Sequence, residues 1–252
     1  MIMGKLFDAL TNFVKDVDSN IEVEKLEEKF NELARVFLYG GYIKVRNDYR
    51  VYIRTVEFYF HSEKDGIHDP IVYHRNNRYI EGEVPYFPTM FLHAHASGFD
   101  ITFEKEGKYR ASALIRSYVV KEAKDNDAKY LIWDKEKEMF VKSEKYGYNT
   151  QSTYLYTLLN GFPICVVDKD NMITWVDDFQ GKQMKDCKVK PNPRQNVPLF
   201  RTENGKFEKV TKEYYENHID EFREKIVEPK FLTYDKIKYL QDYRLWQFER
   251  DN

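Results

Sequence analysis

The sequence predicts a single α+β domain, because its helical and strand-like segments fall into separate runs along the chain. Two apolar stripes with helical spacing come first. Segments of alternating apolar and polar residues, joined by hairpin-type turns, follow them. The chain has 252 residues, which is enough for one large core. No internal repeat and no linker interrupts it, so we expect residues 1–252 to form one domain.

The two helical stripes lie near the N-terminus. The first runs from residue 6 to 17 and stops at Asp18-Ser19-Asn20, so we expect 1–20 to be an N-terminal helical extension. This extension either packs on the domain's own core, which we favour, or presents a surface to a partner. The second stripe ends at Gly40-Gly41, as helices often do, and its apolar residues are Leu26, Phe30, Leu33, Ala34 and Phe37.

The alternating segments predict antiparallel hairpins. Asn47-Asp48 and Glu106-Gly107-Lys108 have the composition of turns, and each separates two such segments. The four segments span residues 42–45, 49–60, 99–103 and 109–120. A polar loop is expected over 61–88, and shorter strands are expected at 130–133, 164–167 and 173–176.

The C-terminal part is expected to be less regular. Residues 152–159 predict a short helix, and the proline-rich stretch 191–198 predicts an irregular, exposed or tightly turned path. We expect 200–252 to be a helical and aromatic segment. Within it, 211–226 predicts a helix, and the aromatic tail 234–248 is expected to pack back on the body.

Composition narrows the classes of function. The formal net charge is −2 and the pI is about 6.3, so the chain lacks the basic excess typical of nucleic-acid-binding proteins, although its charges can still segregate on one surface. Cys165 and Cys187 are the only cysteines and form no C-x-x-C motif, which favours reduced thiols and a cytoplasmic location. Neither a signal peptide nor a long apolar run is present, so we expect no membrane partner.

Glu57 is the least expected residue of the strand predicted over 49–60. Alternation divides the segment 54–60 into two faces, with Arg54, Val56, Phe58 and Phe60 on one and Thr55, Glu57 and Tyr59 on the other. The second face is both polar and aromatic, as the wall of a cleft is. In a simpler alternative, Glu57 faces solvent or pairs with an arginine across the sheet, for which the candidates are Arg54, Arg110 and Arg116.

Histidines are concentrated just after Glu57. Five of the six lie within 35 residues, and these are His61, His68, His74, His93 and His95. One interpretation is a metal site with His68, His93, His95 and Glu57 as ligands. No H-E-x-x-H or comparable spacing supports it, so we favour the alternative that the histidines make ordinary hydrogen bonds in loops and at strand edges.

Several short motifs occur in a distinctive order between residues 33 and 248. In the first half these are Leu33-Ala34-Arg35-Val36-Phe37-Leu38, Val56-Glu57-Phe58-Tyr59, His68 eleven residues after Glu57, Arg75-Asn76, and Met90-Phe91. Ala113-Leu114-Ile115-Arg116-Ser117, Pro193-Arg194 and Trp246-Gln247-Phe248 follow. In order and approximate spacing the chain resembles the alkyladenine (3-methyladenine, or methylpurine) DNA glycosylases, as a divergent member of that family.

The resemblance implies a curved antiparallel sheet flanked by helices and the excision of alkylated or otherwise modified purines from DNA. Such enzymes flip the base into a pocket, because the bond to be cut is inaccessible inside the stack. At the matching positions, Glu57 would activate a water molecule, and Arg116 would position that water and Glu57. Tyr59 and His68 would hold the flipped base. The remaining expected contacts are those of His93 and His95 with the base, and of Arg75, Asn76 and Arg194 with the nucleic-acid backbone. The expected partner is DNA, or a nucleoside or nucleotide, with no cofactor, no metal and no obligate protein partner.

Departures from the family pattern keep other functions open. The interval 92–112 is shorter than the family's tyrosine-rich hairpin and lacks its wedge tyrosine, with His93, His95, Ser97 and Asp100 instead. The family's pocket asparagine has no clear equivalent, and the nearest residues are Thr102 and Glu104. Without a wedge, single-stranded DNA or free nucleosides become candidate substrates. The alternatives are a non-catalytic nucleic-acid or nucleotide-binding protein on the same fold, and a metal-binding enzyme that uses the clustered histidines.

Overall fold

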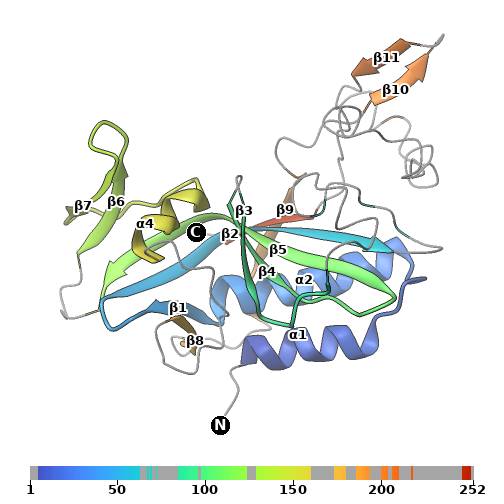
Figure 1. The fold of residues 1–252 in the computed structure, drawn as a ribbon, viewed down its shortest axis with the longest axis horizontal. Helices are drawn as coiled ribbons and strands as arrows, with labels where there is room; N and C mark the ends of the chain where they lie inside the picture. The colour runs from blue at the N-terminus through green and yellow to red at the C-terminus, as the bar shows by residue number, and fades with distance from the viewer. Residues whose placement is uncertain are drawn as a thin grey trace.

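The computed structural model shows an α+β protein that is mostly strand, as predicted, with a curled antiparallel sheet and its two long helices on one side (Figure 1). It describes residues 5–62, 67, 69, 72, 85–95, 98–123, 129–159, 173–179, 186–192, 194, 200–203, 206–209, 217 and 246–250. In those ranges, no helix has the length and apolar character needed to cross a membrane.

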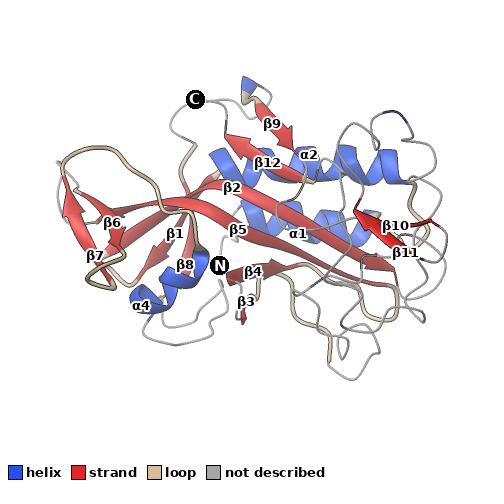
Figure 2. Cartoon of the chain, turned by 90° about the horizontal axis from the view of Figure 1, so that it is seen from above, coloured by secondary structure: helices blue, strands red, loops and turns tan. Residues whose placement is uncertain are grey.

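The two helical stripes of the sequence form α1 (Lys5–Asp16) and α2 (Val23–Tyr39). Their apolar faces meet each other and the sheet, so the N-terminal extension packs on the protein's own core, as predicted. Phe13 of α1 stacks on Phe30 of α2 with 5.9 Å between ring centroids, and Phe30 stacks on Phe58 of the sheet at 4.6 Å. In Figure 2 both helices lie behind the long central strands.

The main sheet has the order β3-β4-β5-β2-β1-β8, and its centre is the antiparallel pair of 14-residue strands β2 (Tyr49–Ser62) and β5 (Tyr109–Glu122). β12 also pairs with β2 and with β9, while β6 pairs with β5 and β7. The other strands are β1 (Gly41–Val45), β3 (Leu92–His95), β4 (Gly98–Thr102), β6 (Tyr130–Asp134), β7 (Met139–Ser143), β8 (Ile173–Asp177), β9 (Val189–Asn192) and β12 (Gln247–Arg250).

The expected turns at Asn47-Asp48 and around Gly107, where φ is +67°, are confirmed, as is a short helix over 152–159. That helix comprises a 3₁₀ turn, η2 (Ser152–Tyr154), followed by α4 (Leu155–Leu159). The strand predicted at 164–167, the helix at 211–226 except Asn217, and most of the loop 61–88 lie outside the described residues.

Two stretches of the C-terminal part contain strands that the sequence did not predict. Pro191 lies in strand β9 and is exposed, which is one of the forms expected for the proline-rich stretch, whereas Pro193 and Pro198 lie outside the described residues. A proline is tolerated there because β9 pairs with β12 alone and is therefore an edge strand, which can lack one N–H donor. The segment 200–252 was expected to be helical and aromatic; most of it lies outside the described residues, and its described parts are mainly strand. These strands are β12 and the separate hairpin of β10 (Phe200–Glu203) with β11 (Lys206–Lys209).

An irregularity in the pairing of β2 with β5 changes which residues face the helices. The pairing of β2 with β5 shifts register between Ile53 and Val56, so Ile53 and Val56 both lie in the core although strict alternation would put them on opposite faces. Arg54 therefore lies on the same face as Glu57 and not with Val56 and Phe58. The face predicted for Arg54 was wrong because strict alternation fails across such an irregularity.

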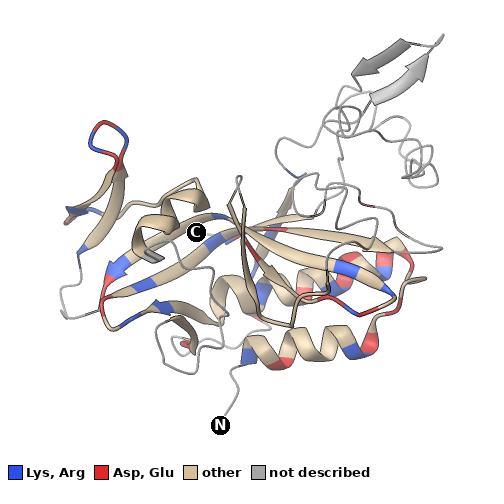
Figure 3. Cartoon of the chain, in the orientation of Figure 1, with Lys and Arg blue, Asp and Glu red and all other residues tan. Residues whose placement is uncertain are grey.

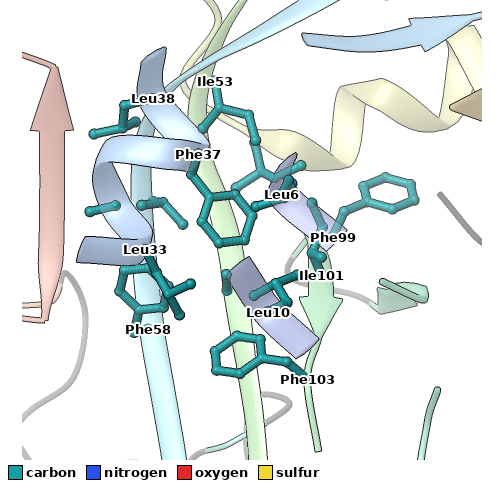
Figure 4. Packing of buried hydrophobic residues seen from close by; sticks show 14 of the residues in the cluster. Leu6, Leu10, Leu33, Phe37, Leu38, Ile53, Phe58, Phe99, Ile101 and Phe103 are labelled. Atoms are coloured by element: carbon teal, nitrogen blue, oxygen red, sulfur yellow. The ribbon is translucent and has the colours of Figure 1, made fainter. Parts of the chain in front are cut away.

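The core between the helices and the sheet is strongly aromatic (Figure 4). Phe58 contacts Phe30, Phe37, Phe103 and Phe248, and Trp246 meets Phe30 edge-on at 5.2 Å. Trp246 and Phe248 come from the end of the chain, so the described part of the aromatic tail packs back on the body as predicted.

Candidate active site

Glu57 lies in the middle of β2 and is fully buried. Its neighbour Phe58 packs against Phe30 of α2, so the carboxylate points to the opposite face of the sheet. On that face it is flanked by its cross-strand partners, Leu114 of β5 and Gln247 of β12. A carboxylate placed there requires compensating groups, because burying an unpaired charge is costly.

Arg116 and Tyr59 supply that compensation at a single oxygen of Glu57. The Nε atom of Arg116 lies 2.8 Å from Oε2, and the Tyr59 hydroxyl donates to the same oxygen at 2.7 Å. Burial works against the charge of Arg116, but the neighbouring Glu57 and Tyr59 outweigh it and raise the pKa of the guanidinium. Burial and the charge of Glu57 also raise the pKa of Tyr59 well above its usual value, so this phenol remains a donor.

Arg116 is therefore the arginine that pairs with Glu57, among the three that the sequence offered. Arg110 forms a fully buried pair with Glu104 at 3.2 Å. Arg54 donates to the hydroxyl of Tyr146. The side chain of Arg116 is 18% exposed while that of Glu57 is 0% exposed, so Arg116 is the part of this pair that solvent reaches.

A second buried ion pair, between Arg194 and Asp69, lies next to the ring of Tyr59. Arg194 Nη1 lies 2.6 Å from Oδ2 of Asp69, and Nη2 lies 3.2 Å from Oδ1. The guanidinium is also 4.7 Å from the ring centroid of Tyr59 and 5.0 Å from that of Trp246. In the structure the side chain of Arg194 is buried and makes two bonds to Asp69, and its expected contact with the nucleic-acid backbone remains a prediction. A phosphate would reach it only if the pair with Asp69 opened.

The hairpin of β3 and β4 brings His93, His95 and Asp100 together. His93 pairs with Asp100 across the strands, and Nε2 of His95 lies 2.8 Å from Oδ2 of Asp100. The ring centroids of the two histidines are 5.7 Å apart. The sequence showed the histidines as a pair, but Asp100 was missed as a site residue because only the hairpin register places it opposite His93.

The Glu57 cluster and the group of His93, His95 and Asp100 share one face of the sheet. The strand registers place His93, Asp100, Leu114, Glu57 and Gln247 in a continuous cross-strand row. Asp100 and Glu57 are separated by one intervening strand, which corresponds to about 10 Å between their backbones. The histidine pair and the Glu57 cluster are thus neighbours, but they do not form one set of ligands.

Other predicted site residues have local roles or lie outside the described ranges. His61 accepts the backbone N–H of Asp69 at 3.0 Å through Nδ1, and Thr102 donates to the carbonyl of Pro88 at 2.7 Å. His68, Arg75 and Asn76 lie outside the described residues, so the expected sandwich around a flipped base and the expected backbone contacts remain predictions.

Basic and aromatic side chains gather on the same face, toward the end of the sheet that carries β6 and β7. We call this group the aromatic–basic strip. Its members are Tyr42, Arg50, Tyr52, Arg54, Lys121, Tyr130, Tyr146 and Tyr148. Each cation lies 5.1–5.6 Å from at least one ring centroid, within the range of cation–π attraction. Figure 3 shows Lys and Arg positions along β1, β2 and β5 in this region.

The strip combines three cations with aromatic rings, although the whole chain is nearly neutral. Tyr146 and Tyr148 are each about half exposed, so their rings are available for stacking. Arg54 lies three residues from Glu57 on β2, roughly 10 Å along the strand. The end of the strip that carries Arg54 therefore lies next to the Glu57 cluster.

Comparison with protein-family models, with curated proteins and with solved structures finds no match to this chain. The resemblance to the alkyladenine DNA glycosylases remains an expectation from the sequence motifs.

Proposed function

We propose that the protein is a hydrolase that cleaves the N-glycosidic bond of an alkylated or otherwise modified purine in DNA, with Glu57 as the general base. The observation that carries this proposal is the convergence of Arg116 and Tyr59 on Oε2 of the buried Glu57. Tyr59 donates a hydrogen bond to the carboxylate, Arg116 pairs with it as a cation, and Arg116 is the partly exposed member of that pair.

The reaction requires a nucleophile and stabilisation of positive charge on the sugar. As the bond between C1′ and the purine nitrogen breaks, the purine leaves with the electron pair and the sugar acquires oxocarbenium character. Glu57 would stabilise that charge and accept a proton from water, whose oxygen forms the new bond to C1′. An alkylated purine leaves readily, because its positive charge is neutralised as it departs. No metal and no redox partner is required for this balance.

The aromatic–basic strip supports nucleic acid as the substrate class. Stacking on exposed tyrosines and attraction of phosphates to Arg54 and Lys121 would hold a single strand without a wedge residue. This arrangement favours a strand whose bases are already unstacked, because flipping a base from a duplex costs a few kcal/mol.

The test is release of methylated purines from single-stranded and duplex DNA that has been treated with a methylating agent. We expect release by the wild-type protein and none by Glu57→Gln, which keeps the shape of the side chain but cannot accept the proton. Glu122→Gln is the matched control, because Glu122 forms a surface pair with Lys142 at the end of β5. Full activity of the Glu57 variant, with circular dichroism unchanged, would refute the proposal.

A second candidate is nucleic-acid binding without turnover, which the strip favours by itself. It predicts that the wild-type protein binds a labelled single-stranded oligonucleotide in fluorescence anisotropy, with affinity falling as salt rises. It also predicts no base release from methylated DNA of either form. Binding without release would support this candidate over the hydrolase.

A further inference from the structure

The geometry points to a binding site for a divalent transition-metal ion of the zinc type, formed by His93, His95 and Asp100. One ligand atom from each of the three side chains lies within 4.8 Å of the other two. This site is separate from the proposed hydrolysis at Glu57, and the inference stands whether or not the protein excises bases.

The hairpin register creates the cluster. His93 and His95 are two residues apart on β3, so both side chains lie on one face, and Asp100 of β4 is paired directly with His93. Phe99 and Ile101, on either side of Asp100, belong to the core, so the carboxylate points to the histidine face. All three donors therefore come from the eight consecutive residues 93–100. An ion bound by them closes only a short loop, so the entropic cost of closure is small.

The distances suit one ion. Two donors of a tetrahedral zinc, each about 2.1 Å from the metal, lie roughly 3.4 Å apart. His95 Nε2 and Asp100 Oδ2 are already 2.8 Å apart, and the third donor lies within 4.8 Å of both. Side-chain rotations that move these atoms on the order of 1 Å complete the set.

The hairpin is held in place by contacts outside the cluster. The backbone N–H of Phe99 donates to Oγ of Ser152 at 3.1 Å. Gly98, at φ +148°, allows that approach, since a Cβ there would lie 2.1 Å from the same oxygen. Phe87 packs on the His93 ring with 4.7 Å between centroids. These contacts fix the strands that carry the ligands, so little ordering remains to be done on binding.

The donor set selects the class of ion. Two imidazoles and one carboxylate suit zinc or iron(II), whereas magnesium and calcium prefer oxygen donors alone. Neutral imidazole is the form that binds a metal. Three protein ligands leave a fourth position for water or an anionic oxygen.

This site differs from the one that the sequence suggested. Glu57 was a candidate ligand there, but it pairs with Arg116 in the structure, and Asp100 takes its place among the described residues. His68 lies outside the described residues and is not needed for three ligands. The distinction gives a clear prediction, because Glu57 variants are expected to leave metal affinity unchanged.

The experiment uses full-length protein purified without a histidine tag and dialysed against a chelator. Zinc is titrated by isothermal calorimetry, and cobalt(II) is added as a spectroscopic probe. We expect one equivalent of zinc per chain and a visible cobalt d–d band without the near-ultraviolet band that a thiolate ligand produces. The absence of this near-ultraviolet band would exclude zinc binding at Cys187 or Cys165.

Variants then locate the ion. His95→Gln and Asp100→Asn are each expected to weaken zinc binding by at least about 10-fold, whereas Glu57→Gln is expected to bind like wild type. His95 is the safer change because its side chain is partly exposed at 11%, and circular dichroism verifies its folding. Failure of the wild-type chain to bind zinc stoichiometrically would overturn the proposal, as would equal binding by wild type and His95→Gln.

Discussion

The Nε atom of Arg116 lies 2.8 Å from Oε2 of Glu57, the same oxygen to which Tyr59 donates at 2.7 Å. The register irregularity between β2 and β5 falls beside Arg116, since Thr55 pairs with Ser117 and Val56 pairs with Ile115. Bulges commonly redirect a side chain near a functional site. A cation and a hydroxyl donor thus meet one buried carboxylate oxygen, and the first prediction concerns this contact.

Arg116→Gln is expected to lower the free energy of unfolding by about 3–5 kcal/mol, because it leaves the buried Glu57 charge without its cation. Under the proposed hydrolysis it also slows base release by about 100-fold or more. Urea denaturation measures the first effect, and the methylated-DNA assay measures the second. Adding Glu57→Gln to Arg116→Gln should recover part of the lost stability, because the charge that needed compensation is then gone. Simple additivity of the two changes would contradict this account.

Tyr59→Phe should cost about 1–3 kcal/mol of stability, because it removes a buried donor and leaves Glu57 with one fewer partner. The ring remains, so its contact with Arg194 is retained. Denaturation midpoints compared with wild type measure the change. Tyr148→Phe is the control, since Tyr148 is half exposed and its variant should stay within about 0.5 kcal/mol of wild type. An equal effect of the two changes would refute the role of the Tyr59 hydroxyl.

Asp69→Asn is expected to destabilise the protein by about 3–5 kcal/mol, because it leaves the buried guanidinium of Arg194 without a full countercharge. The pair is bidentate, and its side chains are 0% and 2% exposed, so salt should screen it little. Denaturation in low and high salt tests both statements. If Asp69→Asn unfolds at the wild-type denaturant concentration, the ion pair contributes little to the fold.

Alanine substitution of Arg54 or Lys121 should weaken binding of a single-stranded oligonucleotide and reduce the salt dependence of that binding. Tyr148→Ala should cost about 1–3 kcal/mol for each base that it stacks. Anisotropy titrations at several salt concentrations measure both effects. Lys15→Ala is the control, because Lys15 is exposed on α1 at the opposite side of the sheet. A similar loss in the control would mean that binding reflects overall charge and not the strip.

Stability should fall at alkaline pH. Burial raises the pKa of Tyr109, and burial followed by the proximity of Tyr154 raises that of Tyr118. The folded chain therefore holds these phenolic protons more tightly than the unfolded chain, whose tyrosines titrate near pH 10. The contribution of these two tyrosines to the free energy of unfolding is fully present below about pH 10. Above that pH it is lost by about 1.4 kcal/mol per pH unit for each tyrosine.

Urea denaturation across the alkaline range, combined with tyrosinate absorbance, measures this effect. Tyr118→Phe should make stability less sensitive to pH above about pH 10, because it removes one of the tyrosines whose pKa is raised by folding. Titration of all tyrosines near pH 10 with the fold intact would contradict the expectation.

Local pattern was sufficient for much of the fold. The helical stripes at Leu6 and Leu26 became α1 and α2, and the turn at Gly107 joined strands where the alternation indicated. Glu57 was also placed correctly, opposite to Phe58, because side-chain direction within a regular strand depends only on its period of two. These are properties of neighbouring residues, which a single sequence contains.

Contacts between distant segments could not be inferred in the same way. On the residue pattern alone, Arg54, Arg110 and Arg116 were equivalent candidates for Glu57. The family resemblance favoured Arg116, and the register of β5 against β2 places it there. In the same way, the hairpin register alone brings Asp100 to His93. Composition and periodicity set which residues face inward. Which inward or outward side chains meet depends on cross-strand pairing, and that pairing is a free-energy balance over the whole sheet.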